Sequence, residues 1–232
     1  MKTLVCAFAF MAMTTLSYAQ EITVQKVQGD VRVRHGVTEQ WTAIAAGDVL
    51  KPDDSMLTGP NGRAVILAMK KGVEKRVTLP PDVIVDIADV RDLSPEELML
   101  KLAMERVRSS PSTSPRDLTA PNAGIVHGAN ERSGRALPGN DPAVGSMQWN
   151  GARVLYDNGF YSTCALKGME LYRLYPETAK SFENRILVAQ SLEHESLRGD
   201  ALNEYSIILS LDGLTPDQQA TVKQQMQRLQ EQ

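Results

Sequence analysis

The stretch GDVLKPDDSMLTGPNGRAVI, residues 47–66, decides how the first half of this chain folds. It contains three aspartates and three glycines and then runs directly into aliphatic residues. The pairs Gly47-Asp48 and Asn61-Gly62 permit positive φ angles and side-chain-to-backbone hydrogen bonds in turns. The stretch therefore predicts two chain reversals between β-strands. The core side chains expected from it are Leu50, Leu57, Val65 and Ile66.

The aspartates of this stretch also allow another interpretation, as ligands of a calcium ion. Asp48, Asp53 and Asp54 carry the hard oxygens that calcium prefers. Their spacing, however, lacks the alternating acids and the terminal glutamate of an EF-hand, and Pro52 interrupts the run. Turn chemistry is the favoured explanation, and the sequence predicts no metal site.

The segments around this stretch carry the signature of strands. Residues 31–34, VRVR, alternate with the period-two pattern of a strand that has one wet face. Residues 63–69, RAVILAM, are apolar on both faces, as in a strand buried on both sides, and Lys71-Gly72 predicts a hairpin turn. Short strands separated by turn signals over residues 21–92 predict an all-β domain, built as a compact β-sandwich or β-roll.

Residues 94–109, SPEELMLKLAMERVRS, change to the helical period. Ser94 is the expected N-cap, and Glu97, three residues later, completes a capping box. The apolar side chains of this helix form a stripe that we expect to pack on the β domain. The stripe consists of Leu98, Leu102 and Val107, with Leu100 and Met104 beside them.

The composition changes again over residues 110–146, which contain five of the twelve prolines, five of the sixteen glycines and no aromatic residue. Such a segment buries too little apolar surface to offset its conformational entropy, so the sequence predicts a flexible linker. From residue 147 onward the pattern is helical, and short loops predict antiparallel hairpins. The expected helices lie near 148–158, 161–174, 178–195, 199–211 and 215–230. The last is expected to be a solvated cap packed through Val222, Met226 and Leu229.

The first twenty residues have the layout of a secretory signal peptide. Lys2 precedes an apolar run over residues 4–16, and small residues stand before Gln20. The run is too short to span a membrane. We expect cleavage after Ala19, with no transmembrane anchor left in the mature chain. Cleavage also removes Cys6, which leaves Cys164 as a lone thiol that we expect to be a small buried hydrophobe.

The β segment and its following helix resemble the FecR domain family. The resemblance covers residues 22–108 and is carried by GDVRVRHG, GVTEQW, GDVL, DSMLTGPNGRAVI, LPPDVIVDI and DLSPEELMLKLAME. The founding members are inner-membrane anti-sigma regulators whose domain of this type lies in the periplasm. The resemblance implies a periplasmic domain that contacts another protein or an envelope component. Only residues 1–3 precede the hydrophobic segment, so the cytoplasmic sigma-binding part is not expected here.

The helical segment resembles degenerate tetratricopeptide repeats. In NGFYSTCALKGMELYRLYP the matching positions are Gly159, Tyr161, Ala165, Leu171 and Pro176, with a weaker echo at Ala201 and Tyr205 in RGDALNEYSIIL. The second unit is out of phase, and Gly168 stands where a bulky residue is usual. The resemblance implies a stack of helical hairpins that binds protein segments on a concave face.

No residue set predicts an enzyme or a cofactor. His35, His127 and His194 fall in three different segments, and the chain has no serine-nucleophile string and no zinc-binding H-E-x-x-H string. It also has no glycine loop of the kind that holds phosphate. A formal net charge of -3 at pH 7 does not indicate the excess of basic residues that is typical of nucleic-acid-binding proteins.

Two weaker candidates involve carbohydrate. A group of carboxylates surrounds the last strand and the helix start, and paired carboxylates perform acid–base chemistry on glycans. These carboxylates are Asp86, Asp89, Asp92, Glu96 and Glu97. Glu96 and Glu97 instead suit the positive end of a helix, so catalysis is not expected. Trp41 offers a stacking platform for sugar, but its place in GVTEQW favours a core role.

The sequence thus predicts a multidomain chain with an all-β and an all-α part. The expected boundaries are a signal peptide over 1–19, a FecR-like β domain with its helix over 20–109, the linker over 110–146 and a tetratricopeptide-like domain over 147–232. The expected function is that of a periplasmic, non-enzymatic protein that contacts an envelope protein in signalling or assembly. The alternative is a module that binds envelope glycan or cell wall.

Overall fold

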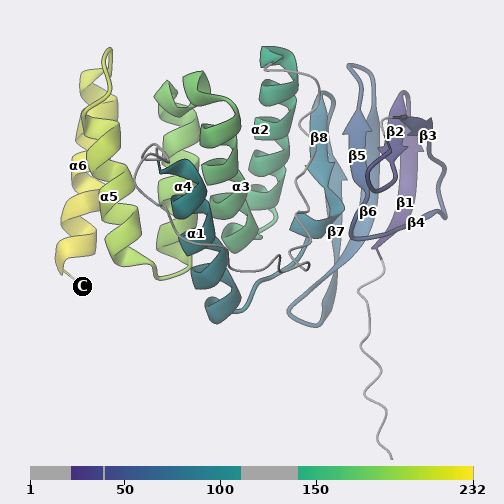
Figure 1. Cartoon of the computed structure of the whole chain (residues 1–232), viewed down its shortest axis with the longest axis horizontal. Helices are drawn as coiled ribbons and strands as arrows, with labels where there is room; N and C mark the ends of the chain where they lie inside the picture. Colours follow the sequence, from purple (N-terminus) through teal and green to yellow (C-terminus); the bar gives the residue numbers. More distant parts are fainter. Residues whose placement is uncertain (1–21, 39, 111–140, 232) are drawn as a thin grey trace, which may run out of the picture.

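The computed structural model describes residues 22–38, 40–110 and 141–231, so the expected signal peptide and most of the expected linker lie outside the described residues. Two antiparallel sheets stand at one end and a row of helices at the other (Figure 1). The strands are β1 (Ile22–Gln28), β2 (Val31–Arg34), β3 (Thr42–Ala43), β4 (Val49–Leu50), β5 (Ser55–Thr58), β6 (Arg63–Lys70), β7 (Val73–Leu79) and β8 (Val83–Asp86). The helices are η1 (Ile87–Asp89), α1 (Pro95–Ser109), α2 (Pro142–Asp157), α3 (Tyr161–Leu174), η2 (Pro176–Lys180), α4 (Phe182–His194), α5 (Arg198–Leu209) and α6 (Pro216–Glu231).

Each sheet has four strands, in the order β4-β1-β6-β7 and β3-β2-β5-β8. The register of β1 against β6 shifts between Val24 and Lys26, which marks a β-bulge. The hairpin turn expected between β6 and β7 is confirmed, because Lys71 and Gly72 have φ angles of 49° and 77°.

The two turns expected in the stretch 47–66 are also present. Gly47 has a φ of 97°, and the Asp48 carboxylate accepts a hydrogen bond of 2.8 Å from the amide of Ala45. At the second turn, a Cβ on Gly62 would lie 2.1 Å from the carbonyl oxygen of Asp30. Only glycine fits such a close backbone approach. The contact between the two chain reversals therefore explains why residue 62 is a glycine.

In β1, β2, β6 and β7 the core side chains lie on one face of the strand, whereas β8 buries Val83, Ile84 and Val85 in succession. In β6, Ala64, Ile66 and Ala68 are buried, whereas Val65 and Leu67 are half-buried on the other side. The expectation that this strand is buried on both faces is therefore wrong. Leu50 and Ile66 supply core as expected, but Leu57 and Val65 do not, because the period-two alternation turns them to the opposite face.

The helix signals in the sequence predicted the start of α1 correctly but predicted the start of α2 too late in the chain. Ser94 caps α1, since its hydroxyl accepts a 3.1 Å hydrogen bond from the Glu97 amide. Helix α2 begins at Pro142, inside the segment expected to be linker, because the Asp141 carboxylate accepts from the Ala143 amide at 2.9 Å. The expected start at residue 148 and the expected linker end at 146 are wrong, since a proline at the first helical position starts a helix.

The remaining helices follow the expected order. Helix α3 has the expected bounds, while the expected helix 178–195 divides into η2 and α4, because Ser181 caps a new helix by accepting from the Asn184 amide. Each helix from α2 to α6 packs on the next one. Val222 and Leu229 of α6 are buried against the core and Met226 is half-buried, as expected. None of the helices in the described ranges has the length and apolar composition needed to cross a membrane.

The helical row and the second sheet are in direct contact. Helix α2 packs on β8, and a Cβ on Gly151 would lie 2.0 Å from the carbonyl oxygen of Ile84. Beside it, the Asn150 side-chain amide donates a 2.8 Å hydrogen bond to the Asp82 carbonyl. Buried side chains of sheets and helices form one continuous hydrophobic cluster, so α2 has a fixed position on the sheet.

Candidate interaction surface

Helix α1 is held against the helical row rather than against the sheets. Leu98 and Leu102 are buried, and α1 contacts α3 (Figure 1). The buried Glu105 carboxylate accepts a 2.5 Å hydrogen bond from Arg173 of α3. Arg106 forms a 2.5 Å ion pair with Asp200 of α5. These contacts fix the rotation of α1 about its own axis.

The opposite side of α1 is apolar and exposed. Its large side chains are between 47 % and 75 % exposed, and four of the eight exposed large hydrophobic residues in the described ranges lie on this one helix. We call this surface the α1 stripe, and it consists of Met99, Leu100, Ala103, Met104 and Val107. The expectation that Leu100, Met104 and Val107 pack on the β domain is wrong, because at 100° per residue they face away from Leu98 and Leu102.

Charged side chains mark the two ends of the α1 stripe. Glu96 is exposed in the first turn of α1, and Arg106 and Arg108 lie in its last turn. Glu97, beside Glu96, is engaged by Arg91 and Lys101, and the hydrogen bond from Arg91 lowers the pKa of this carboxyl. The stripe thus has an acidic end and a basic end, in the order that suits the helix dipole.

A second group of charges surrounds the buried Lys167 ammonium between β8 and α3. The Lys167 ammonium is 2.7 Å from Asp86, 3.1 Å from Glu170 and 3.9 Å from Asp89. Burial opposes the charge of Lys167, but Asp86, Glu170 and Asp89 together raise its pKa well above the ordinary value. Asp86 also accepts a 2.6 Å hydrogen bond from Ser55. We interpret this cluster as the polar junction between the second sheet and the helical row.

The pKa values of the two aspartates at this junction shift in opposite directions. Burial disfavours the charged form of Asp86, yet the nearby Lys167 ammonium holds the pKa of Asp86 below its ordinary value. For Asp89, which lies farther from the ammonium, burial dominates and raises the pKa to about 7. The sequence did not reveal the role of Lys167, since a lysine in an amphipathic helix is normally solvated.

The five carboxylates singled out in the sequence therefore separate into different environments. Asp86 and Asp89 meet at Lys167, while Asp92 accepts a 2.9 Å hydrogen bond from the Lys71 amide at the β6–β7 turn. Glu96 and Glu97 lie in the first turn of α1. The structure thus brings Asp86 and Asp89 together at Lys167, and it places Asp92 and the pair Glu96 and Glu97 elsewhere.

The aspartates of the stretch 47–66 take part in turn and loop contacts. Asp54 is buried, accepts from the Lys51 amide at 2.8 Å and lies 2.9 Å from the ring of His35. Asp53 is exposed. No group of three or more metal-ligating side chains occurs within residues 22–38, 40–110 and 141–231.

The other residues singled out in the sequence lie apart. His194 stacks on Tyr161 with 4.0 Å between ring centroids, and His127 lies outside the described residues. Trp41 is half-buried, with the Arg34 guanidinium 5.2 Å from its ring, so the expected core role is wrong. Cys164 is fully buried in α3 as expected, and burial raises the pKa of its thiol to about 12.

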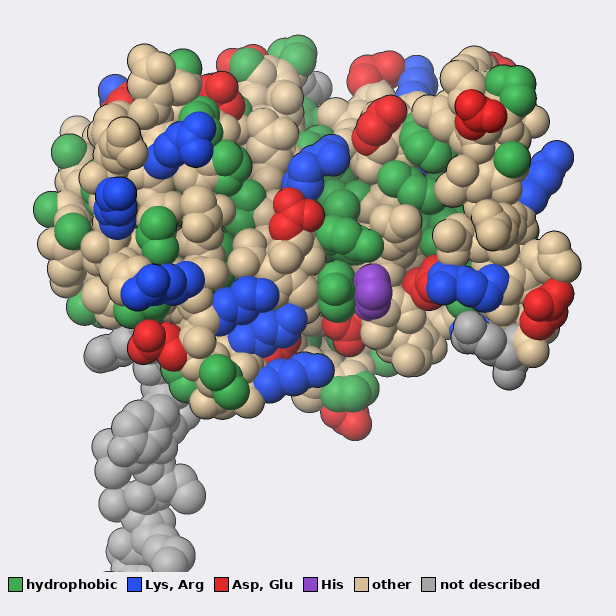
Figure 2. Space-filling view, turned by 180° about the vertical axis from the view of Figure 1, so that it is seen from behind, with side chains coloured by type: hydrophobic (Ala, Val, Ile, Leu, Met, Phe, Trp, Pro, Cys, Tyr) green, Lys and Arg blue, Asp and Glu red, His purple; other side chains and the backbone are tan. Residues whose placement is uncertain are grey.

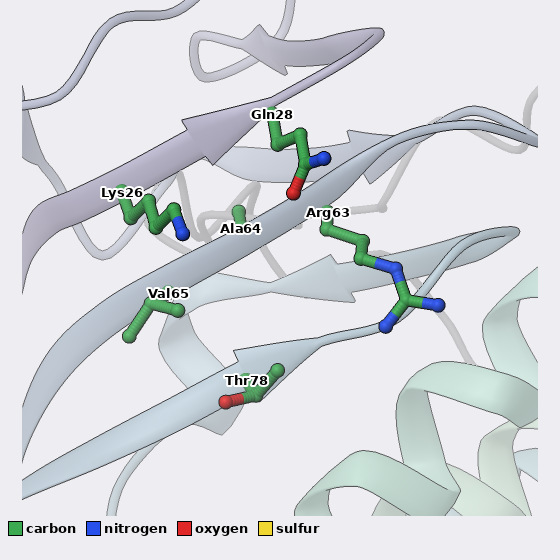
Figure 3. Close-up of a pocket in the computed structure, with 6 residues that line it drawn as sticks. All are labelled: Lys26, Gln28, Arg63, Ala64, Val65 and Thr78. Carbon is green, nitrogen blue, oxygen red and sulfur yellow. The ribbon is translucent and has the colours of Figure 1, made fainter.

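A shallow hollow lies on the outer face of the first sheet, and the sequence did not single it out. It has a volume of about 180 Å³ and spans β1, β6 and β7 (Figure 3). Its lining residues are Lys26, Gln28, Arg63, Ala64, Val65 and Thr78. The period-two alternation of β6, which turns Arg63 and Val65 outward, is the signal that could have identified it. This surface offers hydrogen-bond donors to a polar ligand.

The α1 stripe differs in character from the face of the molecule that lies behind it. Figure 2 shows that face, where acidic, basic and hydrophobic side chains are interspersed. No protein-family model, curated protein or solved structure matches this chain. The choice of a functional surface therefore rests on geometry and chemistry, and both favour the α1 stripe, because contiguous exposed apolar surface marks interaction sites.

Proposed function

We propose that this chain is a secreted, periplasmic, non-enzymatic protein that acts through protein–protein contacts in cell-envelope signalling or assembly. The observation that carries the proposal is the α1 stripe, an apolar face on a helix whose other side is fixed by Leu98, Leu102 and Glu105. In this proposal the two sheets form a β-sandwich of the FecR type, and helices α2 to α6 form tetratricopeptide-like hairpins on which α1 packs through its contact with α3.

The physical case for a protein partner starts from the cost of exposing the α1 stripe. Each exposed apolar Å² costs about 25 cal/mol relative to burial. The contacts of Glu105 with Arg173 and of Arg106 with Asp200 hold this costly face outward and in one orientation. A surface that is ordered before binding loses little conformational entropy when a partner docks. A helix face of this kind is recognised by an apolar groove or by another helix.

In-cell photo-crosslinking tests the proposal directly. A photoreactive residue at Leu100, in the middle of the α1 stripe, should give protein adducts in the envelope fraction of the native cells. The matched control is the same residue at Lys223, which is exposed on α6. Adducts of equal yield at both positions, or no protein adduct at Leu100, would refute the proposed surface. The mass of the purified mature chain tests cleavage after Ala19.

The hollow on the first sheet favours a second candidate function, the binding of envelope glycan or cell wall. Lys26, Gln28, Arg63 and Thr78 present hydrogen-bonding groups around it (Figure 3). Under this alternative, the mature protein should sediment with insoluble peptidoglycan, and the R63A variant should do so less. If R63A leaves sedimentation unchanged but substitution of Leu100 by a polar residue reduces it, the peptidoglycan is bound by the α1 stripe instead.

A further inference from the structure

We propose that the occupant of the α1 stripe is the α1 stripe of a second copy of this chain, packed antiparallel to it. The inference rests on the proposed function, since it names the partner of the same surface. Three features of α1 support it: the spacing of its exposed apolar residues, the small residue at their centre and the distribution of charge along the helix.

The exposed residues have the spacing of a seam between two helices. Leu100, Ala103 and Val107 follow one another at intervals of three and four residues, and Met99 and Met104 lie at the edges of this line. This spacing keeps apolar side chains facing a partner helix along its length. Ala103, near the middle of the stripe, leaves room for the two helix axes to approach closely.

The charges at the two ends select the antiparallel orientation. Glu96 is exposed at the beginning of α1, and Arg108 at its end has a side chain that is 57 % exposed. The other cation of the last turn, Arg106, is engaged by Asp200, and the Glu105 carboxylate near Arg108 is already bound by Arg173. Arg108 itself lies 3.6 Å from the Glu105 carboxylate, and its exposed guanidinium is still accessible to a further carboxylate.

In an antiparallel pair, a two-fold axis brings Glu96 of each copy toward Arg108 of the other, and it does so twice. A parallel pair would place Glu96 against Glu96 and Arg108 against Arg108, which repel. The dipoles of the two helices also oppose one another only in the antiparallel pair. Charge therefore favours one orientation, while the apolar residues supply the attraction.

An interface made by one helix face is small, so we expect a dimer that dissociates on dilution. Analytical ultracentrifugation of the mature full-length chain, over a series of concentrations, measures its dissociation constant. The L100E variant should be monomeric at every concentration, because it buries a charge in the seam. The control variant K223E, which changes charge on the exposed side of α6, should dimerise like the wild type.

A charge exchange tests the orientation. E96R and R108E should each weaken the dimer by about tenfold, since each places like charges at both ends of the seam. The double variant E96R/R108E restores opposite charges and should dimerise with nearly the wild-type constant. A double variant that is weaker than either single variant would rule out the antiparallel pairing. Circular dichroism of each variant verifies that the fold is retained.

The crosslinking at Leu100 separates this inference from the proposed function. Adducts with the mass of two copies support both. A wild-type monomer at all concentrations, with Leu100 joined to a different envelope protein, overturns the inference and leaves the proposed function standing. A monomer in which Leu100 is joined to residues 111–140 of its own chain overturns the inference and removes the basis of the proposed function as well.

Discussion

The Lys167 ammonium lies 2.7 Å from a carboxylate oxygen of Asp86, although 81 residues separate the two in the sequence. This contact joins α3 to the end of β8, and Asp89 and Glu170 complete the charge around it. Removing one member of a buried ion pair leaves an uncompensated charge, and the loss is larger than for any exposed pair. Stability should therefore depend strongly on Lys167.

The K167M variant tests this dependence. We expect its free energy of unfolding to fall by about 3 kcal/mol, because Asp86 and Asp89 lose their shared cation. Denaturant titration monitored by circular dichroism measures the change. The matched control is K180M, since Lys180 pairs with Glu177 at 2.8 Å on the surface, and its loss should have no measurable effect. Equal effects of the two substitutions would contradict the structural role of Lys167.

Asp89 should make stability depend on pH. Its folded pKa of about 7 lies above the ordinary value of 3.8, so the folded state binds more protons than the unfolded state between these values. This contribution is therefore fully present below pH 3.8 and is lost as the pH rises through 7. Because its side chain is partly exposed, solvent reduces the effect. Denaturant midpoints measured from pH 5 to pH 8 should decline less in D89N than in the wild type.

Gly151 should tolerate no side chain. A Cβ at this position would lie 2.0 Å from the Ile84 carbonyl oxygen, so G151A must push α2 away from β8. We expect a loss of about 2 kcal/mol, typical of an overpacked core. The control is G199A in α5, where a Cβ meets nothing within 4 Å and the better helix propensity of alanine should stabilise the fold slightly. Thermal unfolding of both variants makes the comparison.

The two sides of α1 should respond differently to truncation. Leu102 is buried, so L102A should cost about 3 kcal/mol through lost burial and a cavity. Leu100 is exposed in the α1 stripe, and L100A should change the stability of the monomer by less than about 0.5 kcal/mol. Chemical denaturation at low protein concentration measures both. A large loss for L100A would place that side chain in the core and contradict the exposed stripe.

Local signals in the sequence predicted the parts of the fold that depend on neighbouring residues. The turn at Lys71-Gly72, the cap at Ser94 and the bounds of α3 follow from backbone geometry and helical period alone. Helix α2 was placed too late, because a proline both breaks a helix and begins one. Which of the two applies depends on the Asp141 cap.

The placement of α1 could not be predicted in the same way. This helix has apolar residues on two sides, Leu98 and Leu102 on one and Leu100 and Val107 on the other. Periodicity alone groups these residues into one broad stripe and does not show which of them are buried. The choice depends on Arg173, whose ion pair with Glu105 spans 68 residues of sequence. The junction at Lys167 likewise depends on carboxylates that are distant in the chain.

The contact between Gly151 and the Ile84 carbonyl has a consequence for the outline of the molecule. Strand β8 is the outermost strand of its sheet, and the backbone of α2 occupies the space where a ninth strand would lie. A peptide therefore cannot bind at this edge by adding a strand. An unfolded chain likewise cannot pair with this edge and aggregate. Helix α2 thus protects the β8 edge of the second sheet from the addition of another strand.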